Sequence, residues 1–273
     1  MTKKFGIIGN PIKHSLSPIL HNYWFEKYKI DAKYSTIEIK DEDLSNLVNK
    51  IKDKDLSGIN ITLPFKQKIV PHLNVLVNDA NKTGSVNTVY LDDQGTVIGE
   101  NTDVFGLQAA YLKQVDNISK KKLLVIGAGG VSPSIIFALE KSGAKDISII
   151  NRTKEKCIFL KKKFKYLKIV DWSNLKEEVK NYDIIINATS LGLMNGQEFD
   201  FNFESVKSSL IYIDTIYNPL ETKTLKYLKD KNIKVFNGLD MFIYQGQKAF
   251  YLWNKINPEI DQKLIELLLS KLK

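Results

Sequence analysis

Arg152 is the only arginine among the 40 basic residues of this chain, and it stands where arginine has a specific use. It follows the predicted strand Asp146–Ile150, downstream of a Gly-Ala-Gly-Gly turn at 127–130. In a dinucleotide-binding βαβ unit, arginine at this position accommodates the 2′-phosphate of NADP, whereas an acidic residue favours NAD. Guanidinium binds phosphate with two hydrogen bonds and stacks on adenine, which lysine cannot imitate. The two motifs together predict NADP binding; a chance position for one arginine is the alternative.

The glycine-rich turn has the context that a phosphate-binding loop requires. It follows an apolar strand pattern and opens a helix pattern. Gly127 permits the tight turn, Gly129 lets the backbone approach a pyrophosphate, and amides at the start of the helix would face the anion. Lys156, one helical turn after Arg152, could add a second positive charge. A purely structural turn is the alternative. The cofactor residues predicted here are Gly127, Ala128, Gly129, Gly130, Asn151, Arg152, Thr153 and Lys156.

Polar residues in the first part of the chain could carry proton transfer. Asn60 and Thr62 lie on one face of a predicted strand end, because side chains alternate along a strand. Lys66 follows shortly after, and Asp103 stands at the head of a predicted helix. Held against a substrate hydroxyl, a lysine and an aspartate form a proton-transfer pair. A solvated lysine and an N-capping aspartate are the alternatives. Asn87 supplies another amide at the start of a strand.

Ser15 and Ser17 place two hydroxyl groups at the mouth of a predicted helix. Two hydroxyls and free helix amides make a site for a carboxylate. The alternative is that Ser17, which precedes Pro18, is an ordinary N-cap. His21 and His72 have no motif around them, and we interpret both as structural or solvated.

Strand and helix patterns alternate along the whole chain, which indicates an α/β fold with mainly parallel strands. The predicted strands are Lys4–Ile8, Lys33–Ile39, Gly58–Thr62, Val86–Leu91, Thr96–Gly99, Lys122–Ile126, Asp146–Ile150, Lys168–Val170, Asp183–Asn187, Leu210–Asp214 and Lys234–Phe236. The main predicted helices span about 17–28, 41–52, 103–114, 130–142, 239–255 and 258–272. The segment Asp92–Gly95 is typical of a hairpin turn.

The glycine turn lies near residue 127, so another α/β domain must precede the nucleotide domain. We predict an N-terminal α/β substrate domain of residues 1–103 and 239–273, and a Rossmann-type NADP-binding domain of residues 104–238. The C-terminal helices would return to the first domain. The substrate is expected in the cleft between the two domains.

The chain has 273 residues and a formal charge of +9, which suits small anionic ligands. Its basic residues are dispersed, which argues against nucleic acid. Cys157 is the only cysteine, so a reducing compartment fits. The N-terminus has no signal-peptide core, and no apolar run approaches a membrane span. We therefore expect a cytoplasmic protein with a small-molecule substrate, no metal and no membrane partner, as a monomer or a homodimer.

Taken together, these residues resemble the shikimate dehydrogenases, which reduce 3-dehydroshikimate with NADPH in the chorismate pathway to aromatic amino acids. The resemblance runs from about Phe5 to about Phe250. Its markers occur in the family's order: Ser15-Leu16-Ser17-Pro18, Asn60 to Lys66, Asn87, Asn101-Thr102-Asp103, Gly127 to Gly130, Asn151-Arg152-Thr153, Asn187-Ala188-Thr189-Ser190, Asp214 to Pro219, Gly238 to Met241, and Gln245.

The resemblance implies a role for individual residues. Lys66 and Asp103 would be the catalytic pair at the reacting oxygen. Ser15, Ser17 and Tyr217 would hold the substrate carboxylate. The ring hydroxyls would be bound, or their binding supported, by Asn60, Thr62, Asn87 and Gln245. The cofactor residues would extend to Val131, Thr189, Gly238 and Met241. Two departures stand out: Val131-Ser132-Pro133 replaces a segment usually richer in alanine, and Gln247 stands where a small residue is usual.

Two other functions share part of this pattern. A quinate/shikimate dehydrogenase with broader substrate or cofactor use is the nearest, but Arg152 argues against it, as does the serine pair Ser15 and Ser17. A non-catalytic NADP-binding sensor is the alternative from a different class. Loss of Lys66 or Asp103 would have indicated a sensor, and both are present.

Overall fold

The computed structural model describes residues 2–193, 196–201 and 203–272. The chain forms two compact units. The first runs from the N-terminus to Gly106 and includes Ile243–Lys271, and the second comprises Leu107–Phe242. From Ile243 onward the C-terminal helices therefore return to the first unit, as predicted.

The first unit is built on a mixed sheet with the strand order β2-β1-β3-β5-β6-β4. Its strands are β1 (Lys3–Ile8), β2 (Ala32–Ile37), β3 (Gly58–Ile61), β4 (Val75–Leu76), β5 (Thr88–Leu91) and β6 (Val97–Glu100). β1 pairs in parallel with β2 and with β3. β5 and β6 form the predicted hairpin, closed by a hydrogen bond from the Asp92 amide to the Thr96 carbonyl at 2.9 Å.

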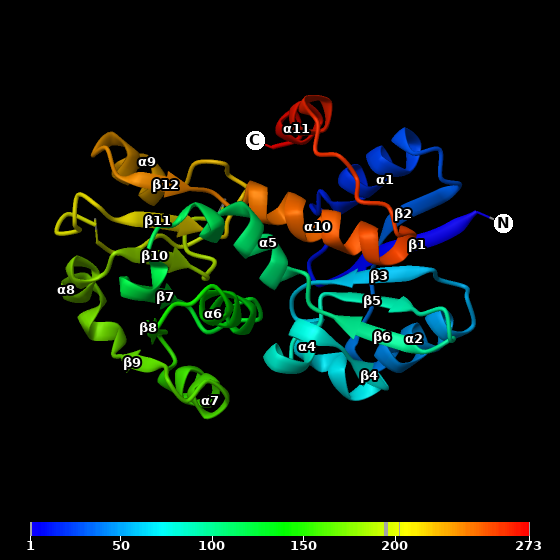
Figure 1. Ribbon diagram of the computed structural model, residues 1–273, viewed down its shortest axis with the longest axis horizontal. Coiled ribbons are helices and arrows are strands. Elements are labelled where there is room, and N and C mark those ends of the chain that lie inside the picture. The colour runs from blue at the N-terminus through cyan, green and yellow to red at the C-terminus, as the bar shows by residue number, and fades with distance from the viewer. Residues whose placement is uncertain (1, 194–195, 202, 273) are drawn as a thin grey trace. The chain divides into compact units, whose positions relative to one another are not determined.

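Helices cover both faces of this sheet (Figure 1). They are α1 (Ser17–Lys27), α2 (Leu44–Lys52), α3 (Phe65–Lys68), α4 (Asn78–Thr83), α10 (Leu239–Asn254) and α11 (Gln262–Leu269). Leu47 and Ile51 of α2 pack against Ile59 and Val89 of the sheet. On the other face, Phe5 of β1 contacts aromatic rings from α1 and α10.

The second unit is a parallel sheet with the strand order β12-β11-β10-β7-β8-β9. Its strands are β7 (Lys122–Ile126), β8 (Asp146–Ile150), β9 (Lys168–Val170), β10 (Ile184–Asn187), β11 (Ile211–Asp214) and β12 (Lys234–Phe236). Renumbered within the unit, this is the order 6-5-4-1-2-3 of a dinucleotide-binding fold. The predicted Rossmann-type fold is therefore confirmed.

The helices of the second unit are α6 (Ser132–Lys141), α7 (Lys154–Lys163), α8 (Leu175–Glu178) and α9 (Lys223–Asp230). α8 and α9 bury Leu175, Leu225 and Leu228 against residues of the sheet such as Ile185 and Tyr212. α5 (Asp103–Ala110) carries the chain from the first unit into the second. β4, α4, α8 and α9 are short elements that were not predicted.

Several predicted helices are shorter in the structure because a side chain or a 3₁₀ turn fixes their ends. The helix predicted at 258–272 begins only at Gln262, since the Asp261 carboxylate caps it by accepting from the Leu264 amide at 2.8 Å. The helix predicted at 103–114 ends at Ala110, and a 3₁₀ turn follows. The one predicted at 41–52 has a 3₁₀ first turn, Asp41–Asp43.

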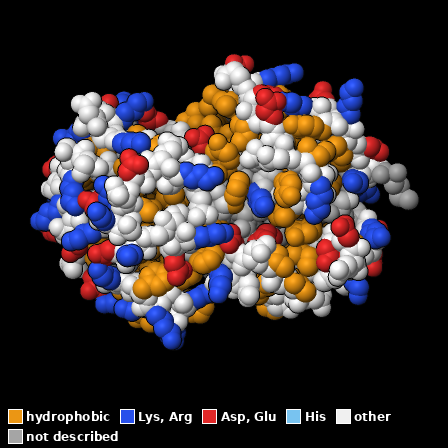
Figure 2. Space-filling view, in the orientation of Figure 1, with side chains coloured by type: hydrophobic (Ala, Val, Ile, Leu, Met, Phe, Trp, Pro, Cys, Tyr) orange, Lys and Arg blue, Asp and Glu red, His pale blue; other side chains and the backbone are white. Residues whose placement is uncertain are grey.

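The surface charge is mixed. In the view of Figure 2, lysine and arginine side chains are spread over the surface with acidic side chains among them. The basic residues are thus dispersed on this face, as they are along the sequence. Within the described residues, no helix is long and apolar enough to cross a membrane. Cys157 is fully buried in α7, and burial raises the pKa of its thiol to about 11, so this cysteine packs as an apolar side chain.

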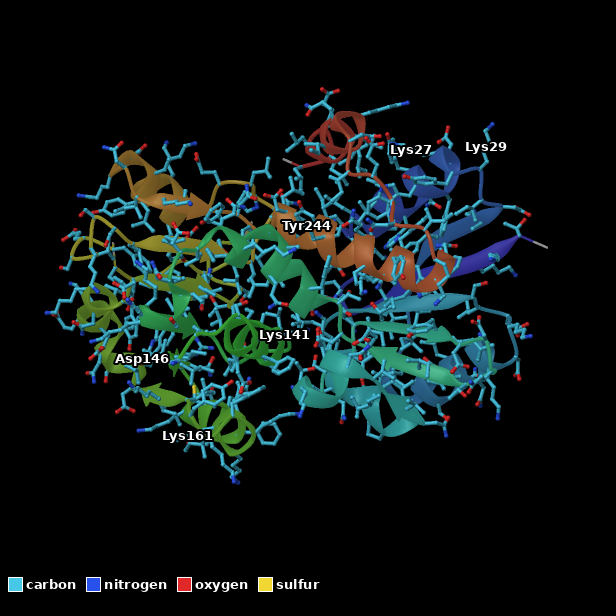
Figure 3. The ribbon with its side chains drawn as sticks, viewed as in Figure 1. Lys27, Lys29, Lys141, Asp146, Lys161 and Tyr244 are labelled. Carbon is cyan, nitrogen blue, oxygen red and sulfur yellow. The ribbon has the colours of Figure 1, made fainter. Side chains whose placement is uncertain are left out.

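The C-terminal segment is held on α1 by a polar cluster around Asp261. Its carboxylate accepts a hydrogen bond from the Tyr23 hydroxyl at 2.8 Å and pairs with Lys27, which lies in the last turn of α1 (Figure 3). Gln247, one of the two departures noted in the sequence, donates to the Pro258 carbonyl at 2.7 Å and connects α10 to the same segment.

We predict that Asp261→Ala destabilises the protein by about 0.5–2 kcal/mol, the usual cost of losing an N-cap. Burial alone would raise the pKa of Asp261, but hydrogen bonds from Lys27, Leu264 and Tyr23 outweigh it and lower the pKa to about 2. A lowered pKa gives stability that is present at neutral pH and is lost as the pH falls towards 2.

Thermal unfolding of both proteins between pH 7 and pH 2 tests this. The difference in Tm should be largest at neutral pH and shrink as the pH falls towards 2. Asp93→Ala, in the exposed hairpin turn, is the matched control and should leave the Tm unchanged. A difference that stays constant over this pH range would contradict the assigned cause.

Candidate active site

The carboxyl ends of β1 and β3 mark the switch point of the first sheet. β1 lies between β2 and β3, so the connections from β1 and β3 leave in different directions, and such a point is where open α/β sheets bind ligands. The loops after the two strands touch: a Cβ on Gly9 would lie 2.5 Å from Thr62. The predicted residues Ser15, Ser17, Thr62 and Lys66 all follow these two strands.

Lys66 and Asp103 form a buried ion pair. Lys66 Nζ donates to Asp103 Oδ2 at 2.6 Å, and the two side chains are 11% and 7% exposed. The Asn101 side chain caps α5, because its Oδ1 accepts from the Asp103 amide at 3.1 Å. The alternatives of a solvated lysine and a capping aspartate are therefore wrong: another residue caps the helix, and the carboxylate is left to hold the lysine.

Asn87 connects this ion pair to the sheet. Its Nδ2 donates to Asp103 Oδ1 at 2.8 Å, so both carboxylate oxygens have a donor. Its Oδ1 accepts from the Thr102 amide at 2.8 Å, and its Nδ2 lies 3.4 Å from Gln245 Oε1 on α10. These bonds fix the orientation of the Asn87 amide, and with it the place of the carboxylate.

Asn60 extends the network into the core. It receives a hydrogen bond on Oδ1 from the Tyr34 hydroxyl at 2.7 Å, and its Nδ2 donates to the Asn87 carbonyl and to Thr88 Oγ1, both at 3.1 Å. Thr88 in turn donates to Asn87 Oδ1 at 3.0 Å. Burial raises the pKa of Tyr34 well above its usual value, although a hydrogen bond with Ser17 acts the other way.

Tyr34 and Thr88 were missed by the sequence analysis. Tyr34 is 1% exposed, although it stands between Lys33 and Ser35 in β2. A lone aromatic residue with a polar tip on the buried face of a strand was the available signal, since its hydroxyl needs a partner there.

Ser15 and Ser17 meet at the start of α1, but Ser17 is not its N-cap. Leu16 occupies the capping position, and the Ser17 amide donates to Ser15 Oγ at 3.2 Å. The alternative that Ser17 is the N-cap is therefore wrong. The Ser15 hydroxyl accepts from the first backbone amide of α1, that of Ser17. Among the histidines, His14 and His72 are exposed. His21 is buried on the Tyr34 ring, and burial lowers its pKa to about 3.

In the second unit, the glycine turn lies at the corresponding switch point, between β7 and β10. Gly127 has φ +112, and a Cβ there would lie 2.9 Å from the Ala188 carbonyl, so only glycine fits. A Cβ on Gly129 would meet nothing closer than 4.0 Å, which leaves room for an approaching ligand. Ser132 fastens the turn by accepting from the Gly129 amide at 2.9 Å and donating to the Gly127 carbonyl at 3.0 Å.

The loop after β8 joins this turn. Asn151 Oδ1 accepts from the Ala128 amide at 3.1 Å, and its Nδ2 donates to the Thr153 carbonyl at 2.9 Å. Arg152, Thr153 and Lys156 are exposed. Neither Arg152 nor Lys156 forms a salt bridge within the described residues, so both cations remain available beside the turn. The arrangement fits a phosphate group on the adenosine side of a dinucleotide.

Two further predicted cofactor residues, Thr189 and Gly238, lie on the loops after β10 and β12, and Tyr217, predicted for the substrate carboxylate, lies on the loop after β11. Thr189 Oγ1 donates to Asn187 Oδ1 at 2.7 Å. A Cβ on Gly238 would lie 2.2 Å from the Thr215 carbonyl oxygen, so this glycine is also required by close backbone packing. Tyr217 packs on Phe242 with ring centroids 4.9 Å apart, and burial raises its pKa to about 12. Met241 is buried at the start of α10.

The Rossmann sheet of the second unit has an arginine after its second strand, and the first unit holds a buried lysine–aspartate pair. Together they define a nicotinamide-dependent oxidoreductase. Comparison with known proteins gives the family. Residues 7–89 match the shikimate dehydrogenase substrate binding domain, and residues 109–224 match the model of shikimate / quinate 5-dehydrogenase. The chain belongs to the shikimate dehydrogenase family.

Individual relatives agree over nearly the whole chain. The NADP(+) shikimate dehydrogenase of Pelagibacter ubique is 45% identical over 268 residues, covering 98% of this chain and 99% of the relative. The crystal structure of shikimate dehydrogenase from Aquifex aeolicus has a TM-score of 0.88 at 37% identity, covering 98% and 97% of the two chains. The Thermus thermophilus enzyme in complex with NADP(H) and shikimate has a TM-score of 0.87 at 31% identity, covering 99% and 100%.

We predict that Thr88→Val lowers the free energy of unfolding by about 1–3 kcal/mol, because it leaves the buried Asn60 and Asn87 amides short of a partner while keeping the shape of the side chain. Urea unfolding measures the change. Thr36→Val, at an exposed position of β2, is the matched control and should be nearly neutral. Equal stability of the two variants would show that the Thr88 hydroxyl does not hold the network.

Proposed function

We propose that this chain catalyses the reversible, NADPH-dependent reduction of 3-dehydroshikimate to shikimate, a step on the route to chorismate and the aromatic amino acids. One observation carries the proposal: the Lys66–Asp103 ion pair is buried at the carboxyl ends of the first sheet and hydrogen-bonded to Asn87. A desolvated ion pair is costly to keep for stability alone, which favours a chemical role.

Lys66 acts on the oxygen that changes from carbonyl to hydroxyl. NADPH, when bound, supplies the hydride that reaches the C3 carbon of the substrate. The Lys66 ammonium stabilises the negative charge that develops on the oxygen and donates a proton to it. Asp103 orients Lys66 Nζ, and Asn87 holds Asp103 by its second oxygen.

Substrate binding is assigned to the residues that the resemblance implied for it. Ser15 and Ser17, together with Tyr217, bind the carboxylate. Thr62, Asn87 and Gln245 bind the ring hydroxyls. Asn60 has the supporting role, because Tyr34, Thr88 and the Asn87 carbonyl already use its amide.

Cofactor binding is assigned to the second unit. The turn and its helix, from Gly127 to Val131, face the pyrophosphate. Arg152 binds the 2′-phosphate, with Asn151, Thr153 and Lys156 around it. Thr189, Gly238 and Met241 lie on the nicotinamide side. On this basis residues 1–103 and 239–273 form the substrate domain, and residues 104–238 the NADP domain. The match of residues 7–89 to a substrate binding domain supports this division.

Two observations favour this function over the alternatives. The Pelagibacter ubique relative is named as an NADP(+) shikimate dehydrogenase, the Thermus thermophilus structure holds NADP(H) and shikimate, and this chain has an arginine that suits a 2′-phosphate. A broader quinate/shikimate dehydrogenase is therefore less well supported. A non-catalytic sensor would have no use for the buried ion pair.

Replacing Lys66 by alanine should lower kcat by at least about 100-fold, because a positioned proton-transfer group typically contributes that much. The KM for shikimate should change much less. Combining it with Asp103→Asn should cost far less than the product of the two single effects, since the two side chains act as a unit. Reduction and oxidation are followed by absorbance of the reduced cofactor.

Lys68→Ala is the control for this experiment, because Lys68 lies in the same helix but is exposed and pairs with Asp41. It should leave kcat unchanged. Near-normal kcat in the Lys66 variant would remove Lys66 from the chemistry and would count against the proposed function.

Arg152→Lys keeps the charge and loses the bidentate geometry and the stacking on adenine. We expect a KM for NADP about 10- to 100-fold higher, which corresponds to a loss of roughly 1.4–3 kcal/mol. Activity with NAD, which has no 2′-phosphate, should barely move. The readout is the ratio of kcat/KM for the two cofactors.

Lys154→Ala, two residues further on, is the matched control, because this exposed lysine pairs with Asp171 instead. It should not change the ratio. An unchanged ratio in Arg152→Lys would place the choice of cofactor elsewhere, with Thr153 and Lys156 as the next candidates.

A further inference from the structure

Asp214, the last residue of β11, is fully buried, and no lysine or arginine pairs with it in the described part of the chain. Three donors satisfy its carboxylate instead. Oδ1 accepts from the Ile216 amide at 3.0 Å and from Asn187 Nδ2 at 3.2 Å, and Oδ2 accepts from Thr222 Oγ1 at 3.1 Å. Burying a carboxylate without a cation is costly. The burial of Asp214 therefore needs an explanation beyond packing.

The three donors come from three different segments. Asn187 ends β10 directly opposite Asp214 in the sheet, and its Oδ1 holds the amide and the hydroxyl of Thr189. Ile216 lies in the loop that leads to Tyr217. Thr222 is the N-cap of α9, where its Oγ1 also accepts from the Leu225 amide at 3.2 Å. One carboxylate thus fastens the loop after β10, the loop after β11 and the start of α9 to each other.

These loops form one half of the proposed cofactor site. Thr189 lies on the loop after β10, and the Gly238 amide donates to the carbonyl of Ile216, on the loop after β11, at 2.8 Å. The other half, with Arg152, follows β8, which lies on the opposite side of β7 from β10 and β11. In a sheet of this order a dinucleotide extends across the switch point, so its two ends contact different loops.

We propose that Asp214 is a positioning residue for the nicotinamide half of the NADP site: it touches no ligand, and it sets the shape of the loops after β10 and β11. This inference rests on the proposed function. Burial raises the pKa of Asp214 to about 6, with the Glu198 carboxylate acting in the same direction and the three hydrogen bonds opposing it. The carboxylate is the form that can accept from all three donors at once.

The test separates the two halves of the site. Asp214→Asn replaces an acceptor oxygen by an amide donor and keeps the shape. Binding of NADP⁺ and of adenosine 2′,5′-bisphosphate, which carries only the adenosine half, is measured by titration calorimetry. We expect the Kd for NADP⁺ to rise about 10-fold, the value of one hydrogen bond to a charged group. The Kd for the bisphosphate should stay within about twofold of the wild-type value.

Asp183→Asn is the matched control. Asp183 lies just before β10, at the amino ends of the strands of the same sheet. There it accepts from the Lys122 amide at 2.8 Å and pairs with Lys207 at 2.7 Å. Its loss should affect stability and leave the binding of both ligands unchanged. This control separates a general weakening of the sheet from a change in the loops at its carboxyl edge.

Equal weakening of both ligands, or no change in either, would overturn the inference while leaving the proposed function intact. If Asp214→Asn does not fold, Thr222→Val removes one of the three donors and must show the same selective loss, and its absence there would overturn the inference as well. Failure of the wild-type protein to bind NADP⁺ would instead overturn the proposed function, and this inference with it.

Discussion

The first unit is organised around the desolvated ion pair of Lys66 and Asp103. Taking both charges out of water costs several kcal/mol per ion, and their attraction alone offsets this only with good geometry and further hydrogen bonds. The structure supplies both. The Asn87 amide donates to the second carboxylate oxygen of Asp103. Asn101 caps α5, so the Asp103 carboxylate is not needed as a helix cap. Thr88 holds the Asn87 side chain by donating to its Oδ1, and Asn60 donates to Thr88 Oγ1 and to the Asn87 carbonyl.

In the second unit, side-chain amides hold the loops at the carboxyl ends of the strands. Asn151 and Asn187 stand at the carboxyl ends of β8 and β10, and each connects the backbone of one loop to a neighbouring segment. An amide offers a donor and an acceptor in one group, so it can join two segments without burying a charge. Asp214 is the exception, and it needs three donors from three segments to be held there.

The sequence predicted the sheet of the second unit well, because buried parallel strands appear as short apolar runs bounded by turn signals. β7, β8, β9 and β12 have the predicted ends. Helix ends were less predictable. Leu16 rather than Ser17 occupies the cap of α1, and α11 starts at Gln262, since backbone dihedral angles and side-chain reach decide a cap. The roles of Tyr34 and Thr88 depend on contacts between distant strands, which spacing along one strand does not reveal.

The two proposed ligand sites treat positive charge in opposite ways, and their chemistry explains why. Arg152 is exposed and has no ion-pair partner among the described residues, which suits a group that must meet a phosphate arriving from water. Lys66 is buried and paired before any substrate arrives, because a proton donor works only if its position is already fixed. A fully exposed lysine at position 66 would lose that fixed position, and a buried, paired arginine at 152 would lose its access to phosphate. Burial, more than charge, separates the two roles.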